Sequence, residues 1–163
     1  MHVATQALIA ARTPYCTRAP ELVNVTRIGG GIIGRCFDNS YSARKMRPST
    51  MMVCGWCVSR WKNDPHTYSI MAHWWNFTNG EHWDTTPLIG DDEEYVLDRA
   101  LHEYAFEHND ELDSHVPSSL VFRDSGMFSV VKPHEDRDWD LMPIAHLTTH
   151  ALFSDSLIVK PRR

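Results

Sequence analysis

Three side chains within the first 84 residues of the sequence have the types that nucleophilic acyl chemistry requires. They are the thiol of Cys36, the imidazole of His73 and the carboxylate of Asp84. A histidine can accept the proton of a thiol and so activate it, and a carboxylate bonded to the other side of the ring holds the histidine in the correct tautomer. This chemistry is possible only if the fold brings the three residues to one place.

The segment 73–87 predicts a β-hairpin that would join the imidazole to the carboxylate. Asn79-Gly80 favours a two-residue type I′ turn, and the register that follows makes His73 and Asp84 diagonal neighbours on one face. A three-residue loop with a glycine bulge would instead place the two residues on opposite faces. A third interpretation is a plain aromatic hairpin in which both are merely polar residues at strand ends.

The segment 36–46 is compatible with a helix that starts at Cys36, and Pro48 closes it. Unpaired N–H groups at a helix start stabilise a thiolate and can donate hydrogen bonds to an oxyanion. Arg35 could add a positive charge beside the thiol. These features make Cys36 the best candidate nucleophile, and the alternative is a buried, inert cysteine.

The other elements must position these residues, and together they predict an α+β fold in a single domain over 1–163. We expect the Cys36 helix to pack on an antiparallel sheet formed by the strand at 50–61 and the hairpin. Hydrophobic periodicity and turn signals predict the following elements: a helix at 2–11, an extended segment at 21–28, strands at 50–61, 68–77 and 81–86, a helix from the acidic residues 91–94 to about 108, short strands at 120–122 and 128–131, and a last helix at 144–153.

Three short motifs surround the candidate residues: Gly34-Arg35-Cys36-Phe37, His73-Trp74-Trp75 and Trp83-Asp84-Thr85-Thr86-Pro87. They resemble the core of the transglutaminase-like superfamily, whose members share a papain-like cysteine fold. The resemblance covers roughly residues 32–87. It implies that Cys36 is the nucleophile, His73 the base and Asp84 the orienting acid of a Cys-His-Asp triad. Residues 91–163 would then be a C-terminal elaboration of this core.

The function that the resemblance implies is cysteine-dependent acyl transfer on a peptide-like amide. The thiol would attack the carbonyl and the histidine would move the protons. Water as the second acceptor gives amide hydrolysis, and an amine gives transfer. The expected partner is a peptide or protein amide substrate, and no cofactor is expected. Since the superfamily also contains binding proteins, the alternative is a non-catalytic protein-interaction module that binds through the Trp-rich hairpin.

The motif Cys54-Gly-Trp-Cys57 points to a different chemistry, because such a pair can be a redox dithiol or half of a zinc site. The neighbouring apolar residues place it inside a strand, where a redox motif would be strained, and no second short-spaced pair completes a zinc site. His146 and His150 are four residues apart but lack the glutamate of a metalloprotease motif. We expect no metal, and a thiol redox protein stays open as an alternative.

Charge and hydropathy argue against other classes of function. The formal charge of −5 gives no electrostatic reason to expect a nucleic-acid surface. No apolar stretch approaches the ~18 residues of a membrane-spanning helix. The apolar run at 7–11 is too short for a signal-peptide core, which predicts a cytoplasmic protein whose four cysteines are reduced. The sequence does not predict the oligomeric state.

Overall fold

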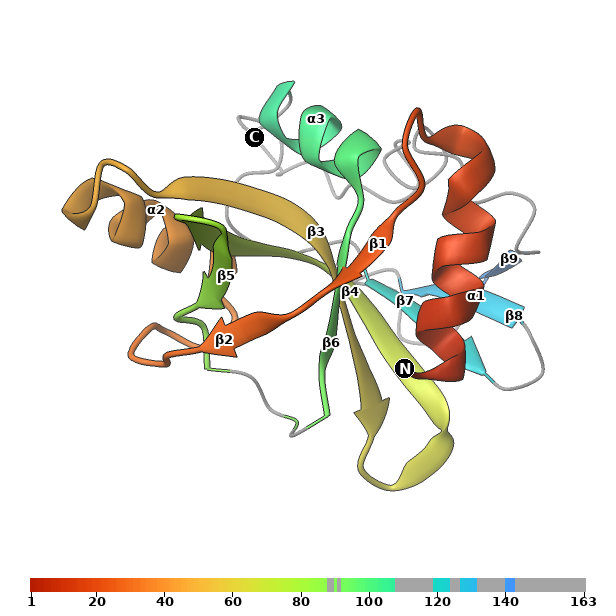
Figure 1. The fold of residues 1–163 in the computed structure, drawn as a ribbon. Coiled ribbons are helices and arrows are strands. Elements are labelled where there is room, and N and C mark those ends of the chain that lie inside the picture. The colour runs from red at the N-terminus through yellow and green to blue at the C-terminus, as the bar shows by residue number, and fades with distance from the viewer. Residues whose placement is uncertain (88–89, 91, 108–118, 124–126, 132–139, 143–163) are drawn as a thin grey trace, which may run out of the picture.

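The computed structural model describes residues 1–87, 90, 92–107, 119–123, 127–131 and 140–142. Within these residues the fold is α+β, as predicted, with three α-helices and one curled, mixed sheet of nine strands (Figure 1). The strand order is β1-β6-β3-β4-β7-β8-β9, and β5 pairs with both β4 and β2. The elements are α1 (Val3–Arg12), a short 3-10 helix (Thr13–Tyr15), β1 (Glu21–Val23), β2 (Val25–Arg27), α2 (Cys36–Met46), β3 (Met51–Trp61), β4 (Asp64–Thr78), β5 (Glu81–Asp84), β6 (Glu94–Leu97), α3 (Arg99–Glu107), β7 (Ser119–Arg123), β8 (Met127–Val131) and β9 (Asp140–Met142).

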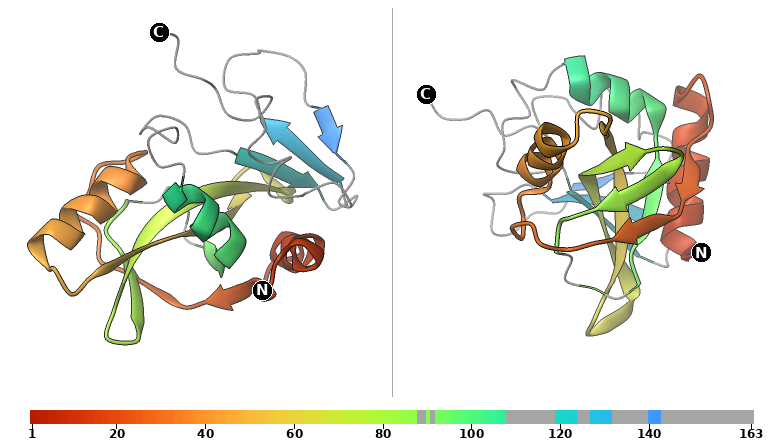
Figure 2. Two further views of the ribbon diagram at one scale, coloured as in Figure 1. Left: turned by 90° about the horizontal axis from the view of Figure 1, so that it is seen from above. Right: turned by 60° about the vertical axis from the view of Figure 1, so that its left-hand side comes forward.

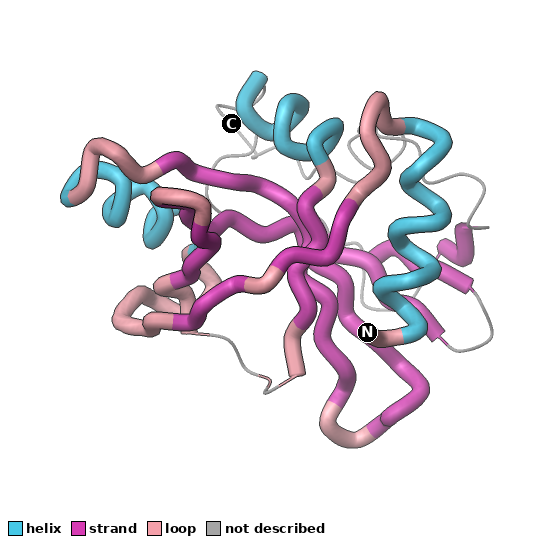
Figure 3. Tube along the Cα trace, in the orientation of Figure 1, coloured by secondary structure: helices cyan, strands magenta, loops and turns pink. Residues whose placement is uncertain are grey.

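The long hairpin of β3 and β4 forms the centre of the sheet, and both strands cross the whole molecule (Figure 3). Its register pairs Gly55 with His73 and Ser59 with Ser69. Because side chains alternate along a strand, odd-numbered residues of both strands share one face and even-numbered residues share the other. This alternation decides which residues enter the core and which face the candidate site.

The even-numbered face carries the main hydrophobic core. Trp56 and Ile70 are completely buried there, together with Leu8 of α1 and Leu101 of α3. Burying each such side chain stabilises the fold by roughly 1.5–3 kcal/mol. Figure 2 shows α1 and α3 lying along this sheet, with α2 at its far end. The odd-numbered face has a smaller core, formed by Val53, Trp75 and Tyr95 with side chains of β1 and β2.

The β4–β5 hairpin has the predicted register. Asn79 and Gly80 have φ angles of 54° and 89°, as a type I′ turn requires, and Thr78 pairs with Glu81. The interpretation with a three-residue bulged loop is therefore wrong. The expectation of an antiparallel sheet is wrong at one place, because β2 runs parallel to β5. Strand β2 reaches β5 only from a distant part of the chain, and local turn signals do not encode such a pairing.

The helix expected from residues 91–94 begins later than predicted. The acidic segment leads into strand β6, which lies between β1 and β3, and the helix starts only at Arg99. Tyr95 and Val96 are both buried, one on each face of the sheet, so burial favours the strand. Asp98 then caps α3, since its carboxylate accepts a hydrogen bond of 3.1 Å from the Leu101 amide.

Asp98 also fastens α1 to the sheet. Its carboxylate accepts hydrogen bonds from Arg12 at 2.7 Å and from the Trp56 indole at 3.0 Å, and Arg12 and Asp98 are both fully buried. Burial alone would raise the pKa of Asp98, but the Arg12 guanidinium and the other donors lower it. The charged pair thus stays ionised inside the protein.

The helix at 36–46, the first helix and the strands near 120 and 128 match their predictions closely. The expected helix at 144–153 lies outside the described residues. No helix in the described part of the chain is long and apolar enough to cross a membrane.

Candidate active site

His73 and Asp84 form the hydrogen bond that the hairpin register predicts. His73 Nε2 lies 2.6 Å from Asp84 Oδ2, and both side chains are buried. An ionised carboxylate can only accept, so Nε2 carries the proton. The carboxylate has two further donors, the Tyr95 hydroxyl at 3.0 Å on Oδ2 and the Thr86 amide at 2.7 Å on Oδ1. Three donors from three segments therefore fix the plane of the carboxylate.

The pKa values of Asp84 and Tyr95 determine which of these two groups carries a proton at neutral pH. Burial would raise the pKa of Asp84, but the hydrogen bonds from His73, Thr86 and Tyr95 outweigh burial and lower it. Burial and the nearby Asp84 charge raise the pKa of Tyr95 far above its ordinary value. Asp84 is therefore an anion and Tyr95 a permanent donor at neutral pH.

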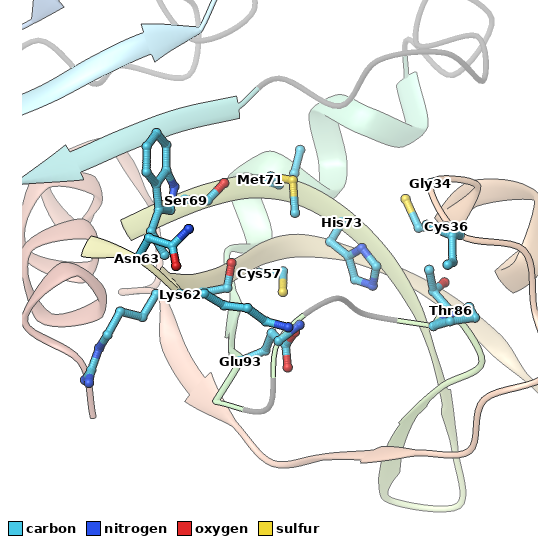
Figure 4. A pocket seen from close by; sticks show the side chains of 17 residues that line it. Gly34, Cys36, Cys57, Lys62, Asn63, Ser69, Met71, His73, Thr86 and Glu93 are labelled. Atoms are coloured by element: carbon cyan, nitrogen blue, oxygen red, sulfur yellow. The ribbon is translucent and has the colours of Figure 1, made fainter. Parts of the chain in front are cut away.

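Cys36 is the first residue of α2, and its thiol lies close to the His73 ring. Since Nε2 faces Asp84, the nitrogen available to Cys36 is Nδ1. Burial alone would lower the pKa of His73, but the hydrogen bond to Asp84 and the nearby Cys36 raise it to about 9. Figure 4 shows Cys36 and His73 beside each other at one end of a cavity. The fold thus brings Cys36 next to an imidazole that is hydrogen-bonded to Asp84.

Asn39, one turn after Cys36, holds the loop that precedes the thiol. Its side chain accepts a hydrogen bond from the Ile32 amide at 2.9 Å and donates to the Ile32 carbonyl at 2.8 Å. It also donates to the Thr86 hydroxyl at 3.2 Å. Asn39 therefore ties the Cys36 helix to the segment that follows Asp84.

Arg35 was expected to add a positive charge beside the thiol, but its side chain binds Asp38. Its guanidinium is bound to Asp38 at 2.6 Å, so it forms an ion pair in the first turn of α2. The unpaired backbone N–H groups of this first turn remain as donors beside Cys36. They are the groups that could stabilise an oxyanion.

Aromatic side chains enclose the imidazole. The His73 ring lies 6.4 Å from the Trp75 ring and 5.7 Å from the Tyr95 ring, measured between centroids. Gly55, opposite His73, makes room for Trp75, because a Cβ at Gly55 would lie 2.4 Å from the Trp75 ring and from the Val96 carbonyl oxygen. Trp75 and Tyr95 therefore pack around the imidazole of His73.

Cys54 and Cys57 do not form a pair. Three residues along a strand span about 10 Å, and the two side chains point to opposite faces. Both thiols are free and buried, and burial raises the pKa of each. This separation excludes a Cys54–Cys57 disulfide without movement of the backbone. No group of three or more His, Cys, Asp or Glu side chains in the described residues could hold a metal ion.

Sequence reasoning missed several residues around the site. Tyr95 was hidden because its segment was read as the start of a helix. Thr86 had a usable signal, since an aspartate often bonds the amide two residues later. His102, near the start of α3, is half-buried and its Nδ1 accepts a hydrogen bond of 3.1 Å from the Cys54 amide.

The cavity beside Cys36 and His73 has a volume of about 530 Å³. It runs over the odd-numbered face of the β3–β4 hairpin toward the turn at Lys62 and Asn63 (Figure 4). Pro87, Gly90 and Glu93 line it on the other side. The candidate nucleophile is therefore accessible from a groove that is much longer than the site itself.

Comparison with known proteins leaves this geometry as the basis for assigning a function. No protein-family model, no curated protein and no solved structure matches the chain.

Proposed function

We propose that the protein catalyses thiol-dependent acyl transfer on a peptide-like amide, on a papain-like or transglutaminase-like core. The observation that supports this most strongly is the position of Cys36 beside His73, whose ring is hydrogen-bonded to Asp84. A structural histidine would need only the bond to the carboxylate. Here one nitrogen of the ring bonds a buried carboxylate, and the ring also lies beside a thiol at a cavity.

The reaction begins with the thiolate form of Cys36 and the imidazolium form of His73. A His73 pKa of about 9 keeps the ring protonated at neutral pH. The sulfur attacks the substrate carbonyl, and the N–H groups at the start of α2 donate to the oxyanion. As the carbon–nitrogen bond breaks, His73 gives its proton to the leaving amine. The product is a thioester on Cys36 and a neutral imidazole.

The second half of the reaction returns the enzyme to its starting state. His73 takes a proton from water or from an amine, and that nucleophile attacks the thioester carbonyl. The carbon–sulfur bond breaks and Cys36 leaves as a thiolate. Water yields a carboxylic acid, and an amine yields a new amide. Asp84 keeps the ring oriented throughout and stays ionised.

Active-site titration tests the proposal. The protein is incubated with a peptide p-nitrophenyl ester at pH 7, and a mass increase on Cys36 is followed by intact-mass and peptide mass spectrometry. We expect one acyl group per chain on Cys36 and none in Cys36→Ala. His73→Ala should slow acylation at least 100-fold, the usual range for a positioned acid–base residue. Equal labelling of several cysteines, or no effect of His73→Ala, would contradict acyl transfer and favour the interaction-module alternative.

A further inference from the structure

The groove beyond Cys36 and His73 has a floor that is built differently from the rest of the sheet. The odd-numbered face is filled by Trp75 and Tyr95 on one side of His73. On the other side it carries Cys57, Ser59, Ser69 and Met71, which line the cavity. In Figure 4, Met71 and Ser69 follow His73 along β4, away from Cys36. Cys57, Ser59 and Ser69 have short side chains, which leave room for a ligand above this part of the sheet.

Two serine hydroxyls in this floor are available for hydrogen bonding. Ser59 and Ser69 lie directly opposite each other on β3 and β4, and both are half-buried. In the described part of the chain, the structure gives neither hydroxyl a partner. A serine hydroxyl can both donate and accept, which suits the N–H and C=O groups of a peptide main chain.

The length of the groove fits an extended peptide. Ser69 is four residues from His73 on β4, which is about 13 Å at the strand rise of ~3.3 Å per residue. Trp61 is six residues from Gly55, the residue opposite His73, which is about 20 Å by the same measure. A segment of four to six extended residues would therefore span the groove from the reacting bond to its far end.

The far end of the groove carries charged side chains, among them Lys62. Arg60 lies 3.8 Å from Asp92, and Glu93, which is buried, pairs with Arg27 at 2.8 Å. Lys62 lines the groove and is exposed, and among the described residues it has no ion-pair partner. A ligand that reaches this end therefore meets the positive charge of Lys62.

We propose that this groove binds an extended peptide segment of the substrate, four to six residues long, with an acidic group at the end farthest from the reacting amide. The Ser59 and Ser69 hydroxyls bind its main chain, and Lys62 binds the acidic group. The inference rests on the proposed function, since it places the reacting amide at Cys36. It adds the substrate class: peptides that carry a carboxylate at a fixed distance from the reacting amide.

The test measures binding in Cys36→Ala, which cannot react. The probes are peptides of alanine and leucine around one central glutamine, with a single glutamate four, five or six residues away on either side, and a matched set with glutamine in its place. Isothermal calorimetry should show that one glutamate position binds about threefold to fivefold tighter than its match, the range of an exposed ion pair. Higher salt should reduce this difference.

Two charge-reversal variants test whether Lys62 causes the preference for glutamate. Lys62→Glu should abolish the preference for glutamate, whereas Lys45→Glu, on the exposed face of α2, should keep it. The double variant Ser59→Ala, Ser69→Ala should weaken the binding of all the peptides to the same extent. Equal binding of both peptide sets, or an equal loss in the two lysine variants, would overturn the inference. Because no step of the test needs chemistry, a failure here is distinguishable from a failure of Cys36 to accept an acyl group.

Discussion

The Tyr95 hydroxyl donates to Asp84 at 3.0 Å, so a strand far along the chain holds the carboxylate that orients His73. We interpret Tyr95 as a positioning residue, because it touches Asp84 and not the cavity. Tyr95→Phe should lower kcat about 10-fold with little change in KM, and the acidic side of the pH–rate profile should move to higher pH. The reason is that loss of one donor raises the pKa of Asp84.

A matched control is available in Tyr68, which is also buried in the sheet but whose hydroxyl has no hydrogen-bond partner in the described part of the chain. Tyr68→Phe should leave the pH profile in place. If both variants changed stability alone and left the profile untouched, Tyr95 would be structural only.

Asn39 should couple the loop before Cys36 to the Asp84 segment. Asn39→Ala removes the two bonds to Ile32 and the bond to Thr86, so three hydrogen bonds between separate segments are lost. We expect a loss of about 2–3 kcal/mol in unfolding free energy, measured in urea. Alkylation of Cys36 by iodoacetamide at pH 7 should also slow. Ser42→Ala, on the exposed side of the same helix, serves as the control, and an equal effect there would reject the coupling.

Gly55 is required by the packing of Trp75. In Gly55→Ala the new Cβ would meet the Trp75 ring and the Val96 carbonyl oxygen at 2.4 Å. A backbone oxygen cannot move aside cheaply, so we expect a loss of about 2–3 kcal/mol or more. Gly80→Asn has open space and a φ that asparagine tolerates, and it should cost under about 1 kcal/mol. Urea unfolding of the two variants compares these costs, and similar losses would contradict the role assigned to Gly55.

The raised pKa of His73 predicts how stability depends on pH. The folded protein holds this proton up to about pH 9, whereas the unfolded chain releases it near pH 6.5. The stabilisation is therefore fully present below about pH 6.5 and is lost as the pH rises toward 9, by at most ~1.4 kcal/mol per pH unit. His73→Asn should reduce this fall in unfolding free energy between pH 6.5 and 9. Parallel slopes for the two proteins between pH 6.5 and 9 would show that folding causes no net proton uptake that depends on His73.

Much of the site follows from local sequence. Asn79-Gly80 determined the hairpin register and so the meeting of His73 with Asp84. The helix start at Cys36 was also readable, because the glycine before it and the proline after the helix mark its ends. These features depend on residues close together in the chain, where turn geometry and helix boundaries are encoded.

The features that sequence reasoning missed depend on residues far apart in the chain. The acidic residues before Tyr95 suit a helix start, but insertion between β1 and β3 makes this segment a strand. Tyr95 reaches Asp84 only through that insertion. The parallel pairing of β2 with β5 likewise requires the intervening helix and hairpin to return the chain to the same place. Tertiary burial, which one sequence does not reveal, outweighs local propensity in both cases.

The most direct measurement is the rate of Cys36 alkylation by iodoacetamide from pH 5 to pH 10, with each cysteine followed separately by peptide mass spectrometry. In the wild type we expect Cys36 to react fast already below neutral pH, because the imidazolium of His73 stabilises its thiolate. His73→Ala should lose this acidic reactivity, whereas Cys57→Ser should retain it. A Cys36 that reacts only above about pH 8, with the same profile in His73→Ala, would show that no thiolate–imidazolium pair exists and would contradict the catalytic proposal.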